Sequence, residues 1–567
     1  MFKTEELATL IRFREELYDG LGLRQDSLSE LVDAVLTAAH RSTLVRLSLT
    51  ATFRHLWSST CDALADGSVD VTVLRTLFTR TLADSAVVDG RPLWVIDGTN
   101  WPRPAARASA DRTWEYRPLP GWPQSGIVPA WAYQWLVAVP DVAGSWVLPL
   151  DVQRRGPTAK SATQVALDQI AAVREAQAPG APRPVVTLDS GYDLETLAHS
   201  TVDADLLVRL AKHRVVYRAP ERHPGRGRPR LHGEPFRLAE EDTHGQPHQS
   251  TRLIHAAYGE VRIDAWTDLH VAGAPDAPFS VVRVQVERLP NKQLPPRPLW
   301  LAWIGGPLPA DLSVLWRWYL RRFTVEHAFR FFKQTLGWTT VRPRNPAAGD
   351  RWSWLIAAAC WQLWLARPLV SDVHVPWEHP RPDGLLTPGQ VRRHFTGISV
   401  RVGTPARAPR TRGKSPGRQK GQRPAPPLHY QVARRPPRRA ALITEFLVQT
   451  STPNGFRVSR CALRVEASRL RTRTARPLRL LPFDRVGPAT PTANAQRETR
   501  NAQPAGKYAK VSNPRQVSHN VCEVGRRGRV AGIQDSAAVH GAHHRNVLQS
   551  HLGATVLADR DTCMRAA

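Results

Sequence analysis

From residue 92 to residue 210 the chain has strand and helix patterns in a fixed order, and two of the expected strands end in an aspartate. The apolar stretches PLWVIDGT, AYQWLVAV and SWVLPLDV are separated by turn residues, which predicts three strands in a meander. The amphipathic stretch KSATQVALDQIAAVREA follows, and then the strand RPVVTLDSGYD, the short helix DLETLAH and the strand DLLVRL. This order predicts a mixed α/β fold with helices packed on a sheet.

The patterns on either side of this core differ from it. TEELATLIRFREELYDGL and LSELVDAVLTAAHR have apolar residues at helical spacing, whereas RLIHAAYGEVRIDAWTDLHV and FSVVRVQVERL resemble strands. Past about residue 400 neither periodicity persists for long. The predicted order is a helical N-terminal domain (1–85), the first part of the core (86–218), a mostly β insertion (219–300), the closing part of the core (301–372) and a Pro- and Arg-rich linker with a basic tail of little order (373–567).

Three carboxylates are candidates for one site. Asp97 ends the first strand of the core, Asp189 ends a later strand, and Glu326 lies in a segment with a helical pattern. Strand-end groups converge in α/β sheets, although a single Asp there is more often a turn or helix-cap residue. Three oxygen ligands without a His or Cys cluster suit Mg²⁺ or Mn²⁺. A pair of such ions can activate a water or a 3′-hydroxyl in phosphoryl transfer.

The segment YLRRFTVEHAFRFFKQTLGW, residues 319–338, predicts a helix with four polar groups in one row. Tyr319, Arg322, Glu326 and Lys333 lie at offsets 0, 3, 7 and 14, which fall within about 60° of one another on a helix. Arg322 and Lys333 are therefore expected to hold phosphates beside the carboxylates. The alternative is a solvated helix face with weak ion pairs.

This spacing, together with DGT around Asp97 and DSGYD around Asp189, resembles the insertion-sequence-four-like DDE transposases. The match to their Y-(2)-R-(3)-E-(6)-K signature has no departure, and the likeness covers roughly residues 85–370. The resemblance implies an RNase H-like fold interrupted by a β insertion, and it makes the helical residues 1–85 the expected DNA-binding domain. It also implies that Asp97, Asp189 and Glu326 bind two Mg²⁺ ions, with Mn²⁺ as a substitute, while Tyr319, Arg322 and Lys333 contact the transposon end.

The activity that this resemblance implies is cleavage of double-stranded DNA at inverted-repeat ends, followed by joining of the 3′-hydroxyls to target DNA. The expected assembly is a homodimer bridging both ends. Some members form a hairpin and stack a Trp of the insertion on a flipped base. Trp300 and Trp303 lie near the expected place, but their apolar neighbours favour ordinary sheet packing.

The positive charge is concentrated in the tail and in one loop. Residues 401–567 hold 32 Lys and Arg against 8 Asp and Glu, which leaves 46 and 41 for residues 1–400. The loop GRGRPRLHG, residues 225–233, resembles an AT-hook, in which Arg228 and Arg230 would enter a minor groove. The tail has two interpretations: a disordered arm that adds nonspecific DNA affinity, or sequence translated after a frame slip in a decaying element.

Several features limit the other function classes. The five cysteines form no CxxC pair, the N-terminus has no secretory signal pattern, and no apolar stretch is long enough for a membrane span, so we expect a cytoplasmic protein associated with the nucleoid. GPTAKS is not a P-loop, so no nucleotide cofactor is expected. Besides the transposase, two alternatives stay open: a noncatalytic DNA-binding protein derived from a decayed transposase, and an RNase H-like nuclease without end recognition.

Overall fold

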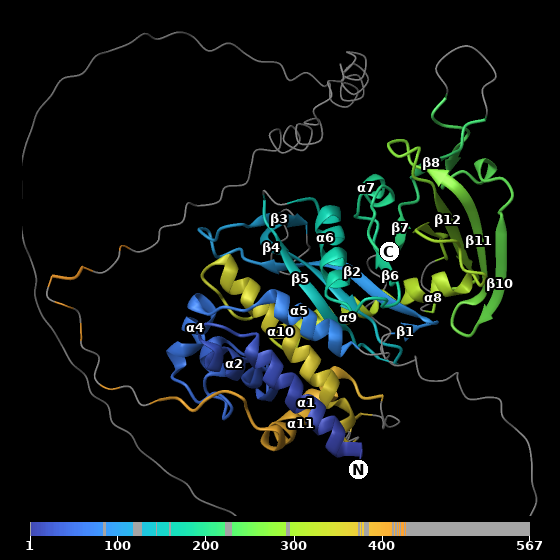
Figure 1. Ribbon diagram of the computed structural model, residues 1–567. Helices are drawn as coiled ribbons and strands as arrows, with labels where there is room; N and C mark the ends of the chain where they lie inside the picture. Colours follow the sequence, from blue (N-terminus) through green and yellow to red (C-terminus); the bar gives the residue numbers. More distant parts are fainter. Residues whose placement is uncertain are drawn as a thin grey trace, which may run out of the picture. The chain divides into compact units, whose positions relative to one another are not determined.

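A mixed β-sheet is the frame of the protein (Figure 1). The computed structural model describes residues 2–82, 87–116, 127–142, 144–157, 160–221, 230–290, 295–371 and 385–410, with a few single positions between 371 and 427. The core strands of the sheet are β2 (Arg91–Pro102), β4 (Ile127–Ala138), β5 (Leu148–Arg155), β6 (Val185–Leu188) and β7 (Asp205–Leu210).

These five strands have the order and directions of an RNase H-like fold. They are arranged β5-β4-β2-β6-β7; β4 is antiparallel to β2 and β5, whereas β6 is parallel to β2 and β7. Helix α6 (Ala162–Glu175) connects β5 to β6, and α7 (Leu194–Ala198) connects β6 to β7. Two short strands, β1 (Val87–Val88) and β3 (Thr113–Tyr116), pair with β2 and β4. The predicted α/β, RNase H-like fold class is confirmed.

The central strand β2 is buried on both faces. Leu93, Trp94, Val95 and Ile96 are consecutive residues, and all four are fully buried. Strands at the centre of a sheet that is covered on both sides have this continuous apolar pattern instead of an alternating one. Exposure returns at Asp97, but the strand continues to Pro102, so the prediction that Asp97 ends this strand was wrong.

The β insertion continues the core sheet. Its elements are β8 (Val215–Arg218), β9 (Pro235–Arg237), the 3₁₀ turn η2 (Glu241–Thr243), β10 (Gln249–His255), β11 (Gly259–His270), β12 (Phe279–Val286) and β13 (Leu299–Ile304). Strand β13 pairs with both β12 and β7, so the predicted boundary at residue 300 was wrong because it divides a strand. Trp300 and Trp303 are buried in the sheet, in agreement with the packing interpretation.

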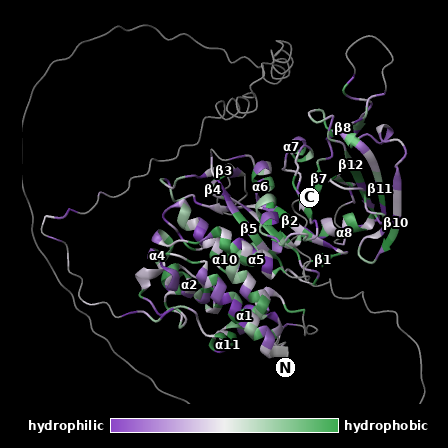
Figure 2. Ribbon diagram, in the orientation of Figure 1, coloured by the Kyte–Doolittle hydropathy of each residue, from purple (hydrophilic) through white to green (hydrophobic). Residues whose placement is uncertain are grey.

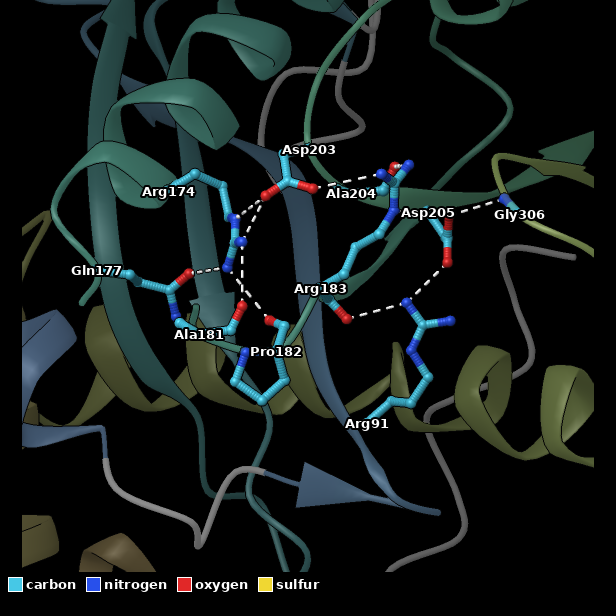
Figure 3. A network of polar contacts seen from close by, with 10 residues as sticks. All are labelled: Arg91, Arg174, Gln177, Ala181, Pro182, Arg183, Asp203, Ala204, Asp205 and Gly306. Atoms are coloured by element: carbon cyan, nitrogen blue, oxygen red, sulfur yellow. Dashed lines mark hydrogen bonds and ion pairs between the residues drawn. The ribbon is translucent and has the colours of Figure 1, made fainter. Parts of the chain in front are cut away.

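An ion-pair network joins the strands at the end opposite Asp97 (Figure 3). The buried carboxylate of Asp205, at the start of β7, accepts from Nη2 of Arg91 at 2.7 Å, Nε of Arg183 at 2.9 Å and the backbone N–H of Gly306 at 3.0 Å. Arg91 begins β2, Arg183 precedes β6 and Gly306 follows β13. One carboxylate therefore links four strands, including the strand shared with the insertion.

A helical layer covers β5. Its elements are α1 (Phe2–Asp19), α2 (Gln25–Thr37), α3 (Leu44–Leu47), α4 (Trp57–Asp66), α5 (Val71–Thr81), α10 (Pro346–Ala366) and the short η3 (Arg367–Leu369). Helix α10 packs on β5 and also against α1, α2 and α4 (Figure 1). Figure 2 shows both hydrophilic and hydrophobic residues on α1, α2 and α4, as expected of helices that bury one face. Among the described helices, none has the length and apolar character to span a bilayer.

The predicted end of the folded body near residue 372 was wrong. Helix α11 (Pro388–Val402) begins with a capping box at Thr387 and packs against α1, α2 and α10. Val391, Phe395 and Ile398 on this helix are buried. The surrounding Pro- and Arg-rich composition resembles a linker, but these three apolar residues have helical spacing and complete the core of the helical layer.

The prediction of a single helix over 319–338 was also wrong, because the helix is interrupted. Helix α8 (Ser313–Arg321) ends at a tight turn, and α9 (Thr324–Gln334) begins after it. The backbone N–H of Val325 donates to the carbonyl of Arg322, three residues back, which marks the turn. Tyr319 therefore lies on α8 while Glu326 and Lys333 lie on α9.

Candidate active site

Asp97 and Asp189 lie at the same level of neighbouring parallel strands, although β2 continues past Asp97 to Pro102 while β6 ends at Leu188. Val95 of β2 is paired with Thr187 of β6, and Asp97 and Asp189 each follow two residues later. Equal offsets from a shared register place the two carboxylates beside each other at one sheet edge. The side chain of Asp97 is 20% exposed and that of Asp189 is 40% exposed, so both can be reached from solvent.

Arg322 connects the third carboxylate to this edge. Its Nη1 lies 3.1 Å from Oδ2 of Asp97, and its Nη2 lies 3.6 Å from Oε1 of Glu326. Arg322 is 3% exposed, whereas the Glu326 side chain is 46% exposed. The turn between α8 and α9 therefore brings Glu326 close to Asp97. The buried guanidinium of Arg322 lies between the two carboxylates.

The pKa of Asp97 reflects the three acids together. Burial raises this pKa to about 6, against the lowering effects of Arg322 and of the backbone N–H of Gly98. Asp189 and Glu326 raise the same pKa by charge repulsion. The interaction is the one expected of carboxylates that converge on a common point.

Asp189 has an oxygen without a hydrogen-bond partner. Its Oδ1 is buried and accepts no hydrogen bond from the described residues, and Nη1 of Arg209 on β7 lies 3.8 Å away. Tyr319 is 1% exposed, and the Arg322 guanidinium lies over its ring at 5.5 Å from the centroid. Burial raises the pKa of the Tyr319 phenol, so it is protonated at neutral pH.

Lys333 reaches the same strand from the far part of α9. Its Nζ donates to Oγ1 of Thr99 at 2.5 Å and lies 5.8 Å from the centre of the Trp338 ring. Thr99 is two residues after Asp97 on β2. The ammonium group is therefore held beside the carboxylates, where it can meet the phosphate of a substrate.

The structure brings together six of the eight predicted site residues. Asp97, Asp189, Arg322 and Glu326 form the centre of the site, and Lys333 and Tyr319 border it. Arg230 is exposed and has no contact with this centre among the described residues. Arg228 lies outside the described residues.

Two residues of the site had no place in the sequence interpretation. Arg209 is the single charged residue after the first position of the buried strand DLLVRL, and Thr99 belongs to the DGT motif. The sequence feature that could have indicated Arg209 is a charged residue inside an otherwise apolar strand. Asp193 caps the helix α7, because its carboxylate accepts from the backbone N–H of Thr196 at 2.9 Å.

The donor set can be compared with the needs of a hard divalent cation. In the part of the chain that the structure describes, no three Asp, Glu, His or Cys side chains are grouped closely enough to hold a metal ion. The Arg322 guanidinium lies between Asp97 and Glu326, where a cation would also be attracted. Carboxylate oxygens are suitable ligands for Mg²⁺ or Mn²⁺, and the unpartnered Oδ1 of Asp189 is available to one. The donor atoms are therefore of a suitable type, but the described side chains, as they stand, are not grouped closely enough to hold an ion.

Comparisons with known proteins found a family model and a solved structure that resemble the chain. Residues 16–271 match the family model described as DDE superfamily endonuclease. The matched span contains Asp97 and Asp189 and ends before α8 and α9. Among solved structures, the chain is similar to the cryo-EM structure of the piggyBac transposase synaptic complex with hairpin DNA, at 7% identity and a TM-score of 0.33, covering 69% of this chain and 73% of that chain. No curated protein matches the chain.

Proposed function

We propose that this chain is a DDE transposase of the insertion-sequence-four-like type. It cuts DNA at the inverted-repeat ends of its own element and joins the 3′-hydroxyls to target DNA. One observation carries the proposal: Asp97 within β2 and Asp189 just after β6 lie side by side in the register of these parallel strands, and Arg322 links Asp97 to Glu326. The superfamily match over residues 16–271 supports it.

The three carboxylates would hold a pair of Mg²⁺ or Mn²⁺ ions. When bound, such ions activate the attacking hydroxyl and stabilise the leaving oxygen in phosphoryl transfer. Arg322 orients Asp97 and Glu326 toward a common point, because one planar guanidinium contacts both. Its positive charge also keeps the two carboxylates close while no substrate is present.

The DNA contacts are proposed from exposure and charge. Lys333, held at Thr99, contacts a phosphate next to the scissile one. Tyr319 and Arg322 are buried in this arrangement, so their main role is to position the neighbouring side chains. They contact the transposon end only at the place where the DNA enters the site. Arg228 and Arg230 contact the minor groove of DNA outside the site. The partners are the inverted-repeat ends, the target DNA and a second copy of the chain.

The test is nicking or joining of a supercoiled plasmid that carries the DNA flanking the coding sequence. The full chain is assayed with Mn²⁺, beside Glu326→Gln, which keeps the side-chain shape but removes its charge. Glu175→Gln, an exposed Glu on α6, is the matched control. The proposal predicts products with the parent and the control and none with Glu326→Gln. A parent that binds the plasmid but neither nicks nor joins it with any divalent metal would instead be the noncatalytic DNA-binding relic.

A further inference from the structure

A cavity of about 370 Å³ lies at the C-terminal end of α9, away from the carboxylates. It is lined by residues of three separate segments: Ala39, His40 and Arg41 after α2, Gln334 and Thr335 at the end of α9, and Arg392 on α11. Two arginines and a histidine line it, and no carboxylate does. A cavity with this lining attracts anions.

Arg392 is a fixed part of this cavity. It is 8% exposed, and its Nε and Nη2 donate to the carbonyls of Val35 and Ala38 at 2.6 to 3.1 Å. Its Nη1 makes no hydrogen bond within the described residues. These bonds cap the C-terminal end of α2 and hold the guanidinium in place, with one amino group left for another acceptor.

The loop after α2, which forms one side of the cavity, lies close to the loop after α9. Gly337, just after α9, has a φ of +76°, and a Cβ built there would lie 3.4 Å from the backbone N of Ser42 and 3.6 Å from Cβ of Arg41. The positive φ favours glycine at this turn, and the two distances place the loop after α9 in contact with the loop after α2. Arg41 and Gln334 belong to one continuous surface.

A polar row on α9 connects the cavity to the candidate active site. Glu326, Arg330 and Gln334 are exposed and spaced four residues apart, so they lie on one side of the helix. From the first to the last is about 12 Å along the helix axis, from a rise of about 1.5 Å per residue. In B-DNA that distance corresponds to roughly three to four nucleotides along one strand.

We propose that the cavity lined by His40, Arg41 and Arg392 binds a backbone phosphate of the DNA strand whose scissile phosphate is at Glu326. Arg330 contacts a phosphate between the two positions. The helical domain and α11 thereby fix the distance between the bound DNA and the point of cleavage. This inference rests on the proposed function for the identity of the strand, but phosphate binding can be measured without cleavage.

The experiment measures binding of a fluorescent duplex with the element's end sequence, in Ca²⁺ to prevent cleavage, over a range of salt concentrations. The full-length parent is compared with Arg41→Gln and Arg330→Gln. Arg46→Gln is the matched control, because Arg46 is an exposed arginine on the adjacent α3 and does not line the cavity. At Arg392 the conservative variant Arg392→Lys is used. A more disruptive substitution would remove the hydrogen bonds to the C-terminal end of α2 and could unfold the helical layer.

The expected result is several-fold weaker binding by Arg41→Gln and Arg330→Gln, with the slope of log affinity against log salt reduced by about 0.9 for each lost phosphate contact. Arg46→Gln keeps the parent's slope, and all variants keep its melting temperature. An unchanged slope in Arg41→Gln overturns the inference even if the parent cleaves DNA. A parent that shows the expected slopes but never cleaves overturns the proposed function and leaves the phosphate site standing.

Experiments with inorganic phosphate distinguish a DNA phosphate from a free small anion as the ligand of the cavity. If the cavity serves DNA, phosphate at millimolar concentration competes only weakly and the Arg41→Gln slope change persists. If phosphate raises the melting temperature of the parent but not of Arg41→Gln, while the DNA slopes of the two are equal, the cavity is a site for free anions and the inference is wrong.

Discussion

Asp97 and Arg322 are 225 residues apart in the chain, yet Oδ2 of the first lies 3.1 Å from Nη1 of the second. The guanidinium is almost completely buried and also faces Glu326. Two acids from different elements are thus oriented by one planar cation. The pair joins the sheet edge to the α8–α9 turn, and the geometry of the candidate site depends on it.

Arg322→Lys tests this orientation. A lysine keeps the charge but cannot contact two carboxylates with one planar fork. We expect DNA nicking to slow by roughly tenfold or more, which is about 1.4 kcal/mol of transition-state stabilisation. Arg317→Lys, on the preceding helix α8 and paired with Asp89, is the control and should nick at the parent's rate. Equal rates for the two variants would show that a positive charge is sufficient at position 322.

Divalent metal is expected to stabilise the folded chain through the three acids. Ligand at about one hundred times its dissociation constant adds about 2.7 kcal/mol to the unfolding free energy. Thermal melting with and without Mn²⁺ should therefore show an increase for the parent that is lost in Asp189→Asn. Asp242→Asn, an exposed aspartate in the insertion, should retain the increase. An equal effect of Mn²⁺ on all three proteins would place the ions elsewhere.

The order of the core could be predicted because each of its strands has a strong local signal. The apolar runs before Asp97 and Asp189 are buried strands, and their parallel pairing follows from the helix between them. The two aspartates could be chosen because residues that follow the apolar runs of neighbouring parallel strands lie side by side, and Glu326 could be chosen from its spacing to Tyr319, Arg322 and Lys333. Local patterns were sufficient for these features.

The remaining features depend on contacts that local patterns do not contain. Thr99 and Lys333 are 234 residues apart, so nothing near either residue indicates their hydrogen bond. The break after Arg321 has no proline or glycine to mark it; it coincides with the buried ion pair of Arg322. Helix α11 was missed because its prolines and arginines resemble a linker, whereas its stability comes from packing on α2 and α10.

Asp205→Asn is expected to lower the unfolding free energy. The carboxylate is 3% exposed and accepts from two arginines and one backbone N–H (Figure 3). Replacing it with an amide weakens these bonds and leaves charged donors without a counter-ion, at a cost of about 1–3 kcal/mol. Urea unfolding should show this change for Asp205→Asn.

Asp203 provides a control within the same network. It accepts from Arg174 and Arg183, but its side chain is 56% exposed. Surface ion pairs contribute about 0–1 kcal/mol, so Asp203→Asn should change the urea midpoint little. If both variants were equally destabilised, burial of Asp205 would not explain the effect.

The stability of the insertion should depend on pH through Asp264. Burial raises the pKa of this carboxyl, but hydrogen bonds from Ser250, Arg283 and Arg262 outweigh burial and lower it overall. A lowered folded-state pKa gives stability that is present above the unfolded value of about 4 and is lost as the pH falls through the folded value. Asp264→Asn should therefore be less stable than the parent at pH 7. The difference in unfolding free energy between the two proteins should become smaller at acidic pH. Urea midpoints from pH 7 to pH 3 measure it, and a constant difference would contradict the assignment.

Phe395→Ala tests whether α11 belongs to the folded body. The Phe395 side chain is completely buried, and α11 packs against α1, α2 and α10. Removing a buried aromatic ring usually costs about 3–5 kcal/mol, from lost transfer energy and the cavity that remains. Val400→Ala, on the same helix but 81% exposed, should be nearly neutral. If both variants unfold at the parent's urea midpoint, α11 is an appendage and the core ends with α10; a large loss confined to Phe395→Ala makes α11 part of the layer that also forms the proposed phosphate cavity.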